Sequence, residues 1–256
     1  MLPGERRLEI LELLRQNRAI SVLDLSRDLA SSVATIRRDL TILEKEGKLE
    51  RTHGGALVGN DEGLVGDESF YMKESVNAAE KTAIAKVAMT MLSDGDSIIL
   101  DAGSTTQALA KRIGRSDLRL TVVTNSATNI QLLIRNPNIT LILLGGQVRL
   151  NTLATVGRSA IEALSGLNIR MTFVGVNGLS PTQGLMTPDP EEGDIKTAMI
   201  AAGRHCIVLA DHSKFRKQAM CRFAPIEKVD TIVTGKKTDS STMDAYRKAG
   251  VRVLEA

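Results

Sequence analysis

Two adjacent arginines, Arg37 and Arg38, have side chains well suited to bind nucleic acid. A guanidinium group can donate paired hydrogen bonds to a guanine edge in the major groove or to a phosphate. On a helix, Ile36, Leu40 and Leu43 would share one narrow apolar stripe, with Arg37 at its edge. The opposite side would carry small, hydroxyl and basic residues, namely Ala34, Arg38, Thr41 and Lys45. Such a helix could pack against a core and still enter a major groove.

Arginine pairs on amphipathic helices more often form a solvated face, so the neighbouring elements must decide between these two interpretations. Apolar residues at helical spacing predict a first helix over residues 5–15. Ser21 can cap a second short helix, and Ser31 or Ser32 can cap a third. Two short helices joined by residues 30–32 have the spacing of a helix-turn-helix.

The segment after the third helix, residues 48–56, suits a small hairpin, or wing, because paired glycines allow a tight turn. Its Arg51 and His53 could contact the DNA backbone. The run Thr-Ile-Arg-Arg-Asp-Leu at Thr35–Leu40 and the wing residues Arg51–Ala56 together resemble the DNA-binding domain of the DeoR family of bacterial transcriptional regulators. Both parts of that family's signature are present in this chain.

The resemblance implies a winged helix-turn-helix domain, residues 1–58, that binds double-stranded operator DNA. Arg38 points away from the apolar stripe and is the expected base reader, while Arg37 is the expected phosphate contact. Leu29 and Ser31 depart from the pattern, because the family usually has an aromatic residue and a valine there. The predicted DNA-contacting residues are Ser32, Ala34, Thr35, Arg37, Arg38, Thr41, Lys45, Arg51 and His53.

Polar or glycine-rich residues follow five apolar runs in the rest of the chain. These endings are Asp101–Thr106, Thr124–Ser126, Gly145–Gly146, Gly175–Gly178 and Asp211–Lys214. In an open α/β sheet the ligand crevice lies outside the carboxyl ends of the strands. The first ending contains Gly-Ser-Thr-Thr before a predicted helix, so it combines backbone N–H groups, hydroxyls and a positive helix end. Those groups suit a phosphate, with Lys214 as a counter-charge.

A regular alternation of apolar runs and helix-like stretches positions these endings. The runs are Ser97–Leu100, Leu120–Val123, Ile139–Leu144, Met171–Val176, Cys206–Ala210, Thr231–Val233 and Val251–Leu254. Continuously apolar strands that alternate with helices predict a parallel sheet covered on both faces. The expected fold is therefore a winged helix-turn-helix followed by a Rossmann-like α/β domain, residues 77–256. Acidic and glycine-rich residues 59–76 are the expected flexible linker.

Each ending also has a purely structural explanation. Asp101 and Asn125 could cap helices, Gly145 and Gly146 could allow a turn, and Lys214 could be a surface lysine. Taken singly, each structural explanation is the better one. Five such endings at one edge of a sheet nevertheless favour a small anionic ligand.

The second half also resembles the DeoR-type sensor domain, whose fold is related to ribose-5-phosphate isomerase and to acetyl-CoA transferases. The matching motifs are Glu80–Ala85, Asp101–Thr106, Val123–Ser126, Leu144–Arg149, Phe173–Gly178 and Ala210–Phe215. The resemblance implies that phosphorylated sugars or related metabolites are the effectors. The predicted effector-binding residues are Lys81, Asp101, Gly103, Ser104, Thr105, Thr106, Thr124, Asn125, Ser126, Gly145, Gly146 and Lys214. Gly235 departs from the Thr-Asp pair of many relatives, and Asn177 and Pro188–Pro190 are places where effector choice could be decided.

Composition places further limits on the function. The chain has 256 residues and a formal net charge of +3, so overall charge does not argue for nucleic acid. No segment resembles a signal peptide or a membrane span. Cys206 and Cys221 lack the spacing of a metal site and form no disulfide framework. We therefore expect a cytoplasmic protein that binds no cofactor, no metal and no membrane.

Two functions from different classes remain. The first is a ligand-controlled regulator, expected from the family resemblance to repress carbohydrate-metabolism genes; since one winged module reads a short site, it should be a homodimer or homotetramer. The alternative is a sugar-phosphate isomerase carrying a DNA-binding head. Its candidate proton-transfer residues are Asp101, Asp189, Glu191, Glu192 and Lys196. No pair is placed convincingly for proton transfer, so we predict a regulator and not an enzyme.

Overall fold

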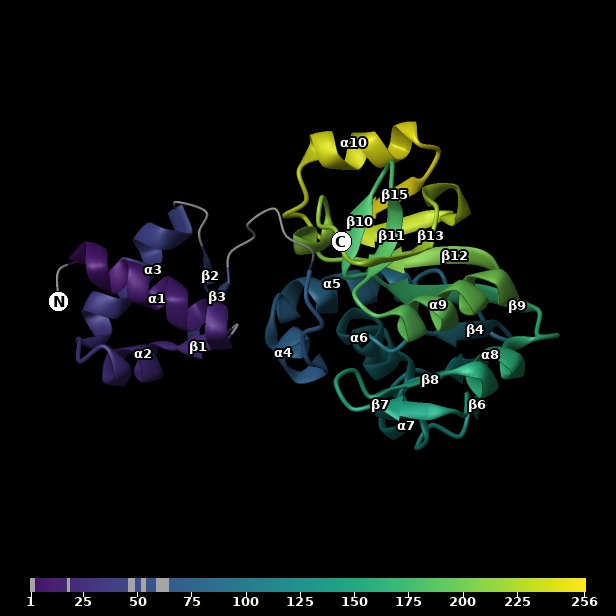
Figure 1. Ribbon diagram of the computed structural model, residues 1–256. Coiled ribbons are helices and arrows are strands. Elements are labelled where there is room, and N and C mark those ends of the chain that lie inside the picture. Colours follow the sequence, from purple (N-terminus) through teal and green to yellow (C-terminus); the bar gives the residue numbers. More distant parts are fainter. Residues whose placement is uncertain (1–2, 18, 46–48, 52–53, 59–64) are drawn as a thin grey trace. The chain divides into compact units, whose positions relative to one another are not determined.

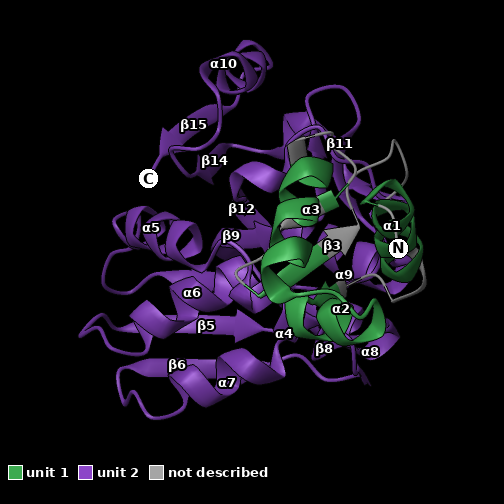
Figure 2. Ribbon diagram, turned by 90° about the vertical axis from the view of Figure 1, so that its left-hand side faces the viewer, with its two compact units in different colours: residues 1–63 green, residues 64–256 purple. Residues whose placement is uncertain are grey.

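The computed structural model describes residues 3–17, 19–45, 49–51, 54–58 and 65–256. The chain forms two compact units, residues 1–63 and residues 64–256 (Figure 2). Within the described ranges, every helix is too short or too polar to cross a membrane.

Helices and a small antiparallel sheet form the first unit (Figure 1). Its elements are α1 (Pro3–Asn17), β1 (Ala19–Ser21), α2 (Val22–Asp28), α3 (Val33–Lys45), β2 (Leu49–Arg51) and β3 (Gly55–Val58). Ile36, Leu40 and Leu43 of α3 are buried in one core with apolar residues of α1 and α2. The apolar stripe predicted for α3 therefore faces this core, and the helix-turn-helix with its wing is confirmed.

Hydroxyl caps define where α2 and α3 begin. Ser21 Oγ accepts a 3.0 Å hydrogen bond from the backbone N–H of Asp24 at the start of α2. Ser32 Oγ accepts a 3.2 Å hydrogen bond from the N–H of Thr35 at the start of α3. Ala30, between these helices, has a φ of 44° and so turns the chain in the left-handed region. The turn is therefore as tight as a helix-turn-helix requires.

A third strand, which the sequence pattern does not predict, completes the wing sheet. β1 pairs antiparallel with β3, so the strand order is β1-β3-β2. A strand of 3 residues is too short to show an alternating pattern. A Cβ on Gly55 would overlap the carbonyl oxygen of Ile20 and lie 2.9 Å from Cα of Ser21. Close approach of β1 and β3 therefore requires a glycine at position 55.

Residues 65–256 form an α/β unit around a seven-stranded parallel sheet. In spatial order the strands are β15 (Arg252–Glu255), β14 (Thr231–Thr234), β12 (Gly203–Leu209), β9 (Ile169–Gly175), β4 (Ser97–Leu100), β5 (Leu120–Thr124) and β6 (Ile139–Leu143). All neighbouring strands are parallel. Each strand corresponds to one of the predicted apolar runs, so the predicted fold class is confirmed.

Helices and smaller sheets cover the two faces of this sheet. They are α4 (Phe70–Ser75), α5 (Ala78–Met89), α6 (Ser104–Ile113), α7 (Ala127–Leu133), β7 (Gln147–Arg149), β8 (Ala154–Val156), α8 (Arg158–Leu164), β10 (Gly178–Ser180), β11 (Gly184–Thr187), α9 (Pro190–Ala202), β13 (Cys221–Ala224) and α10 (Ser240–Lys248). Ile98 and Leu100 of β4 pack with α5, α6 and α7. Ile99 between them packs with α8 and α9 on the other face. Successive side chains of a strand point to opposite faces, so each strand contributes to both layers.

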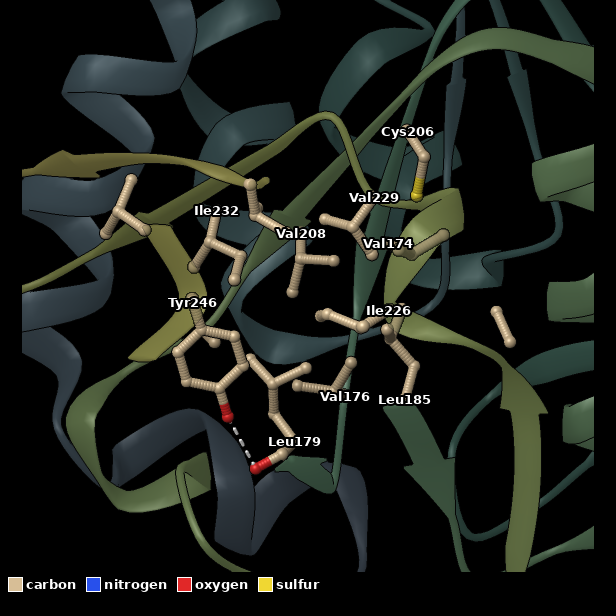
Figure 3. Packing of buried hydrophobic residues seen from close by; sticks show 14 of the residues in the cluster. Val174, Val176, Leu179, Leu185, Cys206, Val208, Ile226, Val229, Ile232 and Tyr246 are labelled. Carbon is tan, nitrogen blue, oxygen red and sulfur yellow. Dashed lines mark hydrogen bonds between the residues drawn. The ribbon is translucent and has the colours of Figure 1, made fainter. Parts of the chain in front are cut away.

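A further apolar cluster joins α10 and the small sheet of β10, β11 and β13 to the central sheet (Figure 3). Tyr246 of α10 is buried, and its hydroxyl donates a 2.8 Å hydrogen bond to the carbonyl oxygen of Leu179. Its ring meets the ring of Phe215 edge-on, with 5.4 Å between centroids. Burial raises the pKa of the Tyr246 hydroxyl. The hydrogen bond satisfies the polar end of a side chain that otherwise fills an apolar core.

Part of the segment predicted as a flexible linker, residues 59–76, belongs to the second unit. Residues 70–75 form α4, and Phe70 at its start is only 3% exposed. The expectation of flexibility is therefore wrong for α4, because Phe70 docks it against the α/β unit. Residues 59–64 lie outside the described residues. The exact domain boundaries stay a prediction.

Candidate functional site

Helix α3 presents predicted DNA-contacting residues on the side opposite its buried stripe. Arg37 and Arg38 are exposed, and so is Ala34. The hydroxyls of Thr35 and Ser32 form a 2.8 Å hydrogen bond at the start of the helix. These five residues come from one helix and its cap, so they form one polar surface of the kind that can enter a major groove.

The other predicted DNA contacts are half-buried or lie outside what the structure describes. Thr41 is half-buried, and its hydroxyl donates a 2.8 Å hydrogen bond to the carbonyl oxygen of Arg37. The side chains of Lys45 and Arg51 lie outside what the structure describes, and His53 lies outside the described residues altogether. DNA contacts by these four residues stay predictions.

Asp39, directly after the two arginines, has a role that the sequence analysis missed. It is 4% exposed and accepts a 2.6 Å hydrogen bond from Arg6 Nε, while Arg7 Nε lies 3.8 Å away. Both arginine partners belong to α1, so these ion pairs hold α3 against α1. They thereby set the direction in which the exposed side of α3 faces. No local sequence signal reveals this role, because the partners lie far apart in the chain.

A pocket lies at the carboxyl ends of β4 and β9, beside the start of α6. Four of the predicted effector-binding residues line it, namely Gly103, Ser104, Thr105 and Lys214. The other lining residues are Phe70, Lys73, Ala102, Thr152, Gly175, Val176, Asn177, Glu192 and Lys196. Gly103 is the N-cap of α6 and supplies no capping side chain. The pocket therefore combines hydroxyls, lysines and an uncapped helix start, which are the groups an anion site uses.

Two lysines make this pocket electropositive. Within the described part of the chain, neither Lys73 nor Lys214 forms an ion pair with a carboxylate. Burial lowers the pKa of the Lys73 ammonium, the Glu192 carboxylate opposes that shift, and the charge of Lys214 adds to it. An anion near both ammonium groups would offset their mutual repulsion.

Asp101 and Lys196 form a buried ion pair in the wall of the pocket. Lys196 Nζ donates to Asp101 Oδ2, and the same oxygen accepts a 2.9 Å hydrogen bond from the N–H of Gly175. Asp101 thus connects β4, β9 and α9. It was predicted as an effector ligand, but its side chain is used inside the protein, so direct contact stays a prediction. The charges of the pair cancel, and Lys196 adds little net charge to the pocket.

Thr106 and Thr124 were also predicted at the site, and both lie behind the pocket lining. The Thr106 hydroxyl donates a 2.7 Å hydrogen bond to the carbonyl oxygen of Asp101. The Thr124 hydroxyl donates a 2.6 Å hydrogen bond to the carbonyl oxygen of Leu100. These bonds satisfy buried carbonyls where β4 ends. Both threonines therefore shape the loop that carries Ser104.

Asn125 and Ser126 have comparable supporting positions. Asn125 Oδ1 accepts a 2.9 Å hydrogen bond from the N–H of Ala102, and its Nδ2 donates a 3.2 Å hydrogen bond to the carbonyl oxygen of Thr155. Ser126 Oγ caps α7 by accepting a 3.2 Å hydrogen bond from the N–H of Asn129. The polar rim predicted for these residues lies within the wall, and effector contact by them stays a prediction.

Gly145 and Gly146 follow β6 and lie outside the pocket lining. Gly146 has a φ of +121°, and a Cβ there would overlap the carbonyl oxygen of Val156. The turn into the β7–β8 hairpin therefore explains a glycine at position 146. A role for either glycine in effector binding stays a prediction.

Lys81 is buried below α4 rather than in the pocket lining. Its Nζ donates to the carbonyl oxygen of Lys73 and, at 2.6 Å, to that of Val76. Burial lowers the pKa of Lys81 to about 8, although the Asp211 carboxylate opposes the shift. Lys81 thus binds the carboxyl end of α4 and positions Lys73, which does line the pocket.

One group of side chains in the described ranges could hold a metal ion. Glu80, Asp211 and His212 each bring a ligand atom within 4.8 Å of the others. His212 Nδ1 lies 2.6 Å from Glu80 Oε2, and the backbone N–H of His212 donates a 2.8 Å hydrogen bond to Glu80 Oε1. Burial acts to raise the pKa of Asp211, but the charge of Lys214, hydrogen bonds from Ser213 and the charge of Lys81 together outweigh it and lower the pKa. These neighbours therefore favour the charged form of Asp211.

Phe70 and Lys73 line the pocket, although neither was predicted as a site residue. Glu192, which also lines it, was named only as a proton-transfer candidate of the isomerase alternative, and Arg149 only as part of a matching motif. Phe70 and Lys73 lie in residues 59–76, whose acidic and glycine-rich composition predicted a linker rather than part of a binding site. The available signal was Ser69 followed by an apolar residue, because Ser69 Oγ caps α4 through a 3.4 Å hydrogen bond from the N–H of Met72.

Comparisons with known proteins cover both units. The family model for the DeoR C terminal sensor domain matches residues 76–236, and the model for the DeoR-like helix-turn-helix domain matches residues 6–62. The HTH-type transcriptional regulator GlpR of Haloferax volcanii is 34% identical over 255 residues, covering 100% of this chain and 98% of that protein. The putative aga operon transcriptional repressor of Escherichia coli O157:H7 is 30% identical over 251 residues, covering 98% and 93%.

The HTH-type transcriptional repressor GlcR of Bacillus subtilis is 32% identical over 254 residues, covering 99% of this chain and 96% of that protein. These whole-length relatives are transcriptional regulators, and the residues matched by the two family models include α3 and the start of α6. The chain therefore belongs to the DeoR family of transcriptional regulators, and it is a DNA-binding regulator rather than an enzyme.

Proposed function

We propose that this regulator is a cytoplasmic repressor of carbohydrate-metabolism genes, and that a phosphorylated sugar controls its affinity for operator DNA. The observation that carries the proposal is the pocket beside α6, where Lys73 and Lys214 have no carboxylate partner in the described part of the chain. Two relatives are named as repressors, the putative aga operon repressor and GlcR, and they support the repressor role. The isomerase alternative is not favoured, because the whole-length relatives are regulators.

In the proposed complex the phosphate lies near Lys73 and Lys214, at the start of α6. The hydroxyls of Ser104 and Thr105 and the first N–H groups of α6 donate to its oxygens, and the helix dipole favours its charge. We expect Asn177, which also lines the pocket, to bond a sugar hydroxyl. We expect occupancy to lower operator affinity and so to relieve repression, with a coupling of about 1–3 kcal/mol.

A phosphorylated sugar is expected to raise the melting temperature of the full chain as its concentration rises. A ligand that binds only the folded state stabilises by about 2.7 kcal/mol at about 100 times its Kd. Lys214→Ala and Thr105→Ala should weaken this effect, because both residues line the pocket. Lys237→Ala, at an exposed position outside the lining, should leave it unchanged. A thermal-shift panel of sugar phosphates and their unphosphorylated parents checks this; equal stabilisation by a parent sugar would place the phosphate site elsewhere.

Arg38→Ala is expected to weaken operator binding by about 1–3 kcal/mol and to relax sequence preference at one position, because a bidentate guanine contact is lost. Arg37→Ala should instead weaken binding to all sequences alike and flatten its salt dependence, because a phosphate contact is lost. Titrations of both variants with operator and unrelated DNA at several salt concentrations distinguish the two roles. Full affinity in Arg38→Ala would contradict the groove assignment.

We also propose that the regulator is a homodimer or homotetramer, and that edge strand β6 contacts a second copy. One winged module reads a short site, so paired half-sites require paired modules. β6 belongs to a sheet that was predicted to be covered on both faces, but its Ile142 and Leu143 are 40% and 48% exposed. Val148 and Leu150 are exposed in the hairpin that follows. The open edge carries no charged residue, so it can pair with a copy of itself.

Leu143→Lys is expected to shift the protein toward monomer and to weaken operator binding, because a charge on the edge strand opposes strand pairing. Light scattering at working concentration measures the mass. Met220→Lys changes another exposed apolar residue, away from β6, and should leave the mass unchanged. A strict monomer that binds operator tightly would contradict the oligomer, and an unchanged mass in Leu143→Lys would contradict the β6 contact.

A further inference from the structure

Arg149, at the end of β7, links the wall of the pocket to the segment that leads out of the first unit. Its guanidinium lies 2.8 Å from Asp67, 3.0 Å from Asp189 and 2.7 Å from Glu192. The side chain is only 14% exposed, so water screens these charges little. Glu192 lines the pocket, whereas Asp67 lies four residues beyond Gly63, where the first unit ends.

The segment around Asp67 is fastened to the turn between β7 and β8. Asn151 Nδ2 donates a 2.9 Å hydrogen bond to Asp67 Oδ2, and the N–H of Phe70 donates a 2.7 Å hydrogen bond to the carbonyl oxygen of Asn151. Burial acts to raise the pKa of Asp67, but Asn151 and Arg149 outweigh it and lower the pKa. Asp67 Oδ1 is buried and has no hydrogen-bond partner among the described residues. Arg149 and Asn151 therefore together hold this segment in place.

Glu192, at the other end of the link, lines the pocket, so the charge of a bound ligand acts on it directly. Glu192 Oε1 is bound by Arg149, and its Oε2 accepts a 3.3 Å hydrogen bond from the Thr187 hydroxyl. Glu192 also stabilises the charged form of Lys73. A bound phosphate carries the same sign as Glu192 and competes with it for Lys73. Occupancy therefore changes the forces on Glu192 and on the guanidinium that it shares with Asp67.

We infer that Arg149 is a positioning residue that transmits occupancy of the pocket to residues 65–69, and this inference rests on the proposed anion pocket. In the empty protein one guanidinium is shared by three carboxylates, Asp67, Asp189 and Glu192. A phosphate in the pocket repels the like-charged carboxylate of Glu192, which lines the same pocket, so Glu192 takes a larger share of Arg149 and Asp67 a smaller one. Residues 65–69 then loosen, whereas α4 stays held at the pocket through Phe70 and Lys73. The effector thus acts on the stretch of chain that follows the DNA-binding unit.

The test measures hydrogen–deuterium exchange of the backbone amides of residues 65–75 in the full chain. Samples contain inorganic phosphate or, at equal ionic strength, sodium chloride. In the unchanged chain we expect phosphate to raise exchange in residues 65–69 severalfold. In Arg149→Gln phosphate should still stabilise the protein in a thermal shift, but its effect on exchange should be absent. Asp67→Ala removes the other end of the link, at a less buried position, and should give the same result.

Arg158→Gln is the matched control, because this arginine is 89% exposed and pairs with Glu162 on its own helix. It should behave like the unchanged chain. If phosphate fails to stabilise the unchanged chain, the proposed anion pocket is wrong and the role of Arg149 falls with it. If phosphate stabilises Arg149→Gln and Asp67→Ala and exchange still responds to it, the pocket stands and the inference is wrong. If Arg149 had only a structural role, Arg149→Gln would speed exchange by the same factor with and without phosphate. The difference in exchange between the phosphate and sodium chloride samples would then remain.

Discussion

Replacing Lys196 by methionine is expected to lower the free energy of unfolding of the α/β unit by about 3–5 kcal/mol. The substitution leaves the Asp101 carboxylate, which is 1% exposed, without its ammonium partner. It also removes a 3.1 Å hydrogen bond to the carbonyl oxygen of Gly175 and a cation placed 5.6 Å from the centroid of the Phe223 ring. Methionine fills much of the same volume, so the lost charge rather than a cavity dominates the effect. Urea unfolding of the full chain, followed by circular dichroism, measures the change.

Lys111→Met is the matched control, since it removes the same chemical group from an ion pair at the surface. Lys111 lies 2.8 Å from Glu74, with side chains 47% and 37% exposed. Water screens such a pair, so the expected loss is below about 1 kcal/mol. A loss that small in Lys196→Met as well would mean that Asp101 does not depend on Lys196, contrary to the ion pair described.

Gly55→Ala is expected to abolish operator binding by destabilising the first unit while the second remains folded. The new Cβ would overlap the carbonyl oxygen of Ile20, and backbone cannot rotate away as a flexible side chain can. Overpacking costs about 1–3 kcal/mol even in side-chain cores. A unit of about 60 residues is marginally stable, so this cost is a large share of its stability. Operator titration, with hydrogen exchange of each unit, measures both parts of the expectation.

Gly54→Ala separates this packing effect from the general cost of changing a wing glycine. A Cβ on Gly54 would have no atom within 4 Å, so operator affinity and exchange should stay close to those of the unchanged chain. Normal operator binding by Gly55→Ala would show that β3 does not approach β1 as closely as the structure places it.

The sequence by itself determined the helices of the first unit and the strands of the central sheet, with their buried faces, because these depend on local periodicity. The stripe of Ile36, Leu40 and Leu43 predicted both the buried side of α3 and its exposed arginines, and the structure agrees. Seven apolar runs predicted seven parallel strands, since strands buried on both faces are continuously apolar. Part of the pocket lining, from Gly103 to Thr105, was also predictable. An apolar strand that is followed by glycine and hydroxyl residues at a helix start is recognisable in the local sequence.

Only the tertiary structure decided which polar residues line the pocket and which support it. Asp101 and Asn125 follow strands in the same way as Ser104, yet their side chains are used by partners distant in sequence, Lys196 and Thr155. Lys73 came from a segment whose composition predicted a linker, and it enters the pocket because α4 docks through Phe70. Local patterns record which face of an element is buried. They do not record what that face meets, since burial, ion pairing and pKa depend on groups that the fold brings together from distant positions.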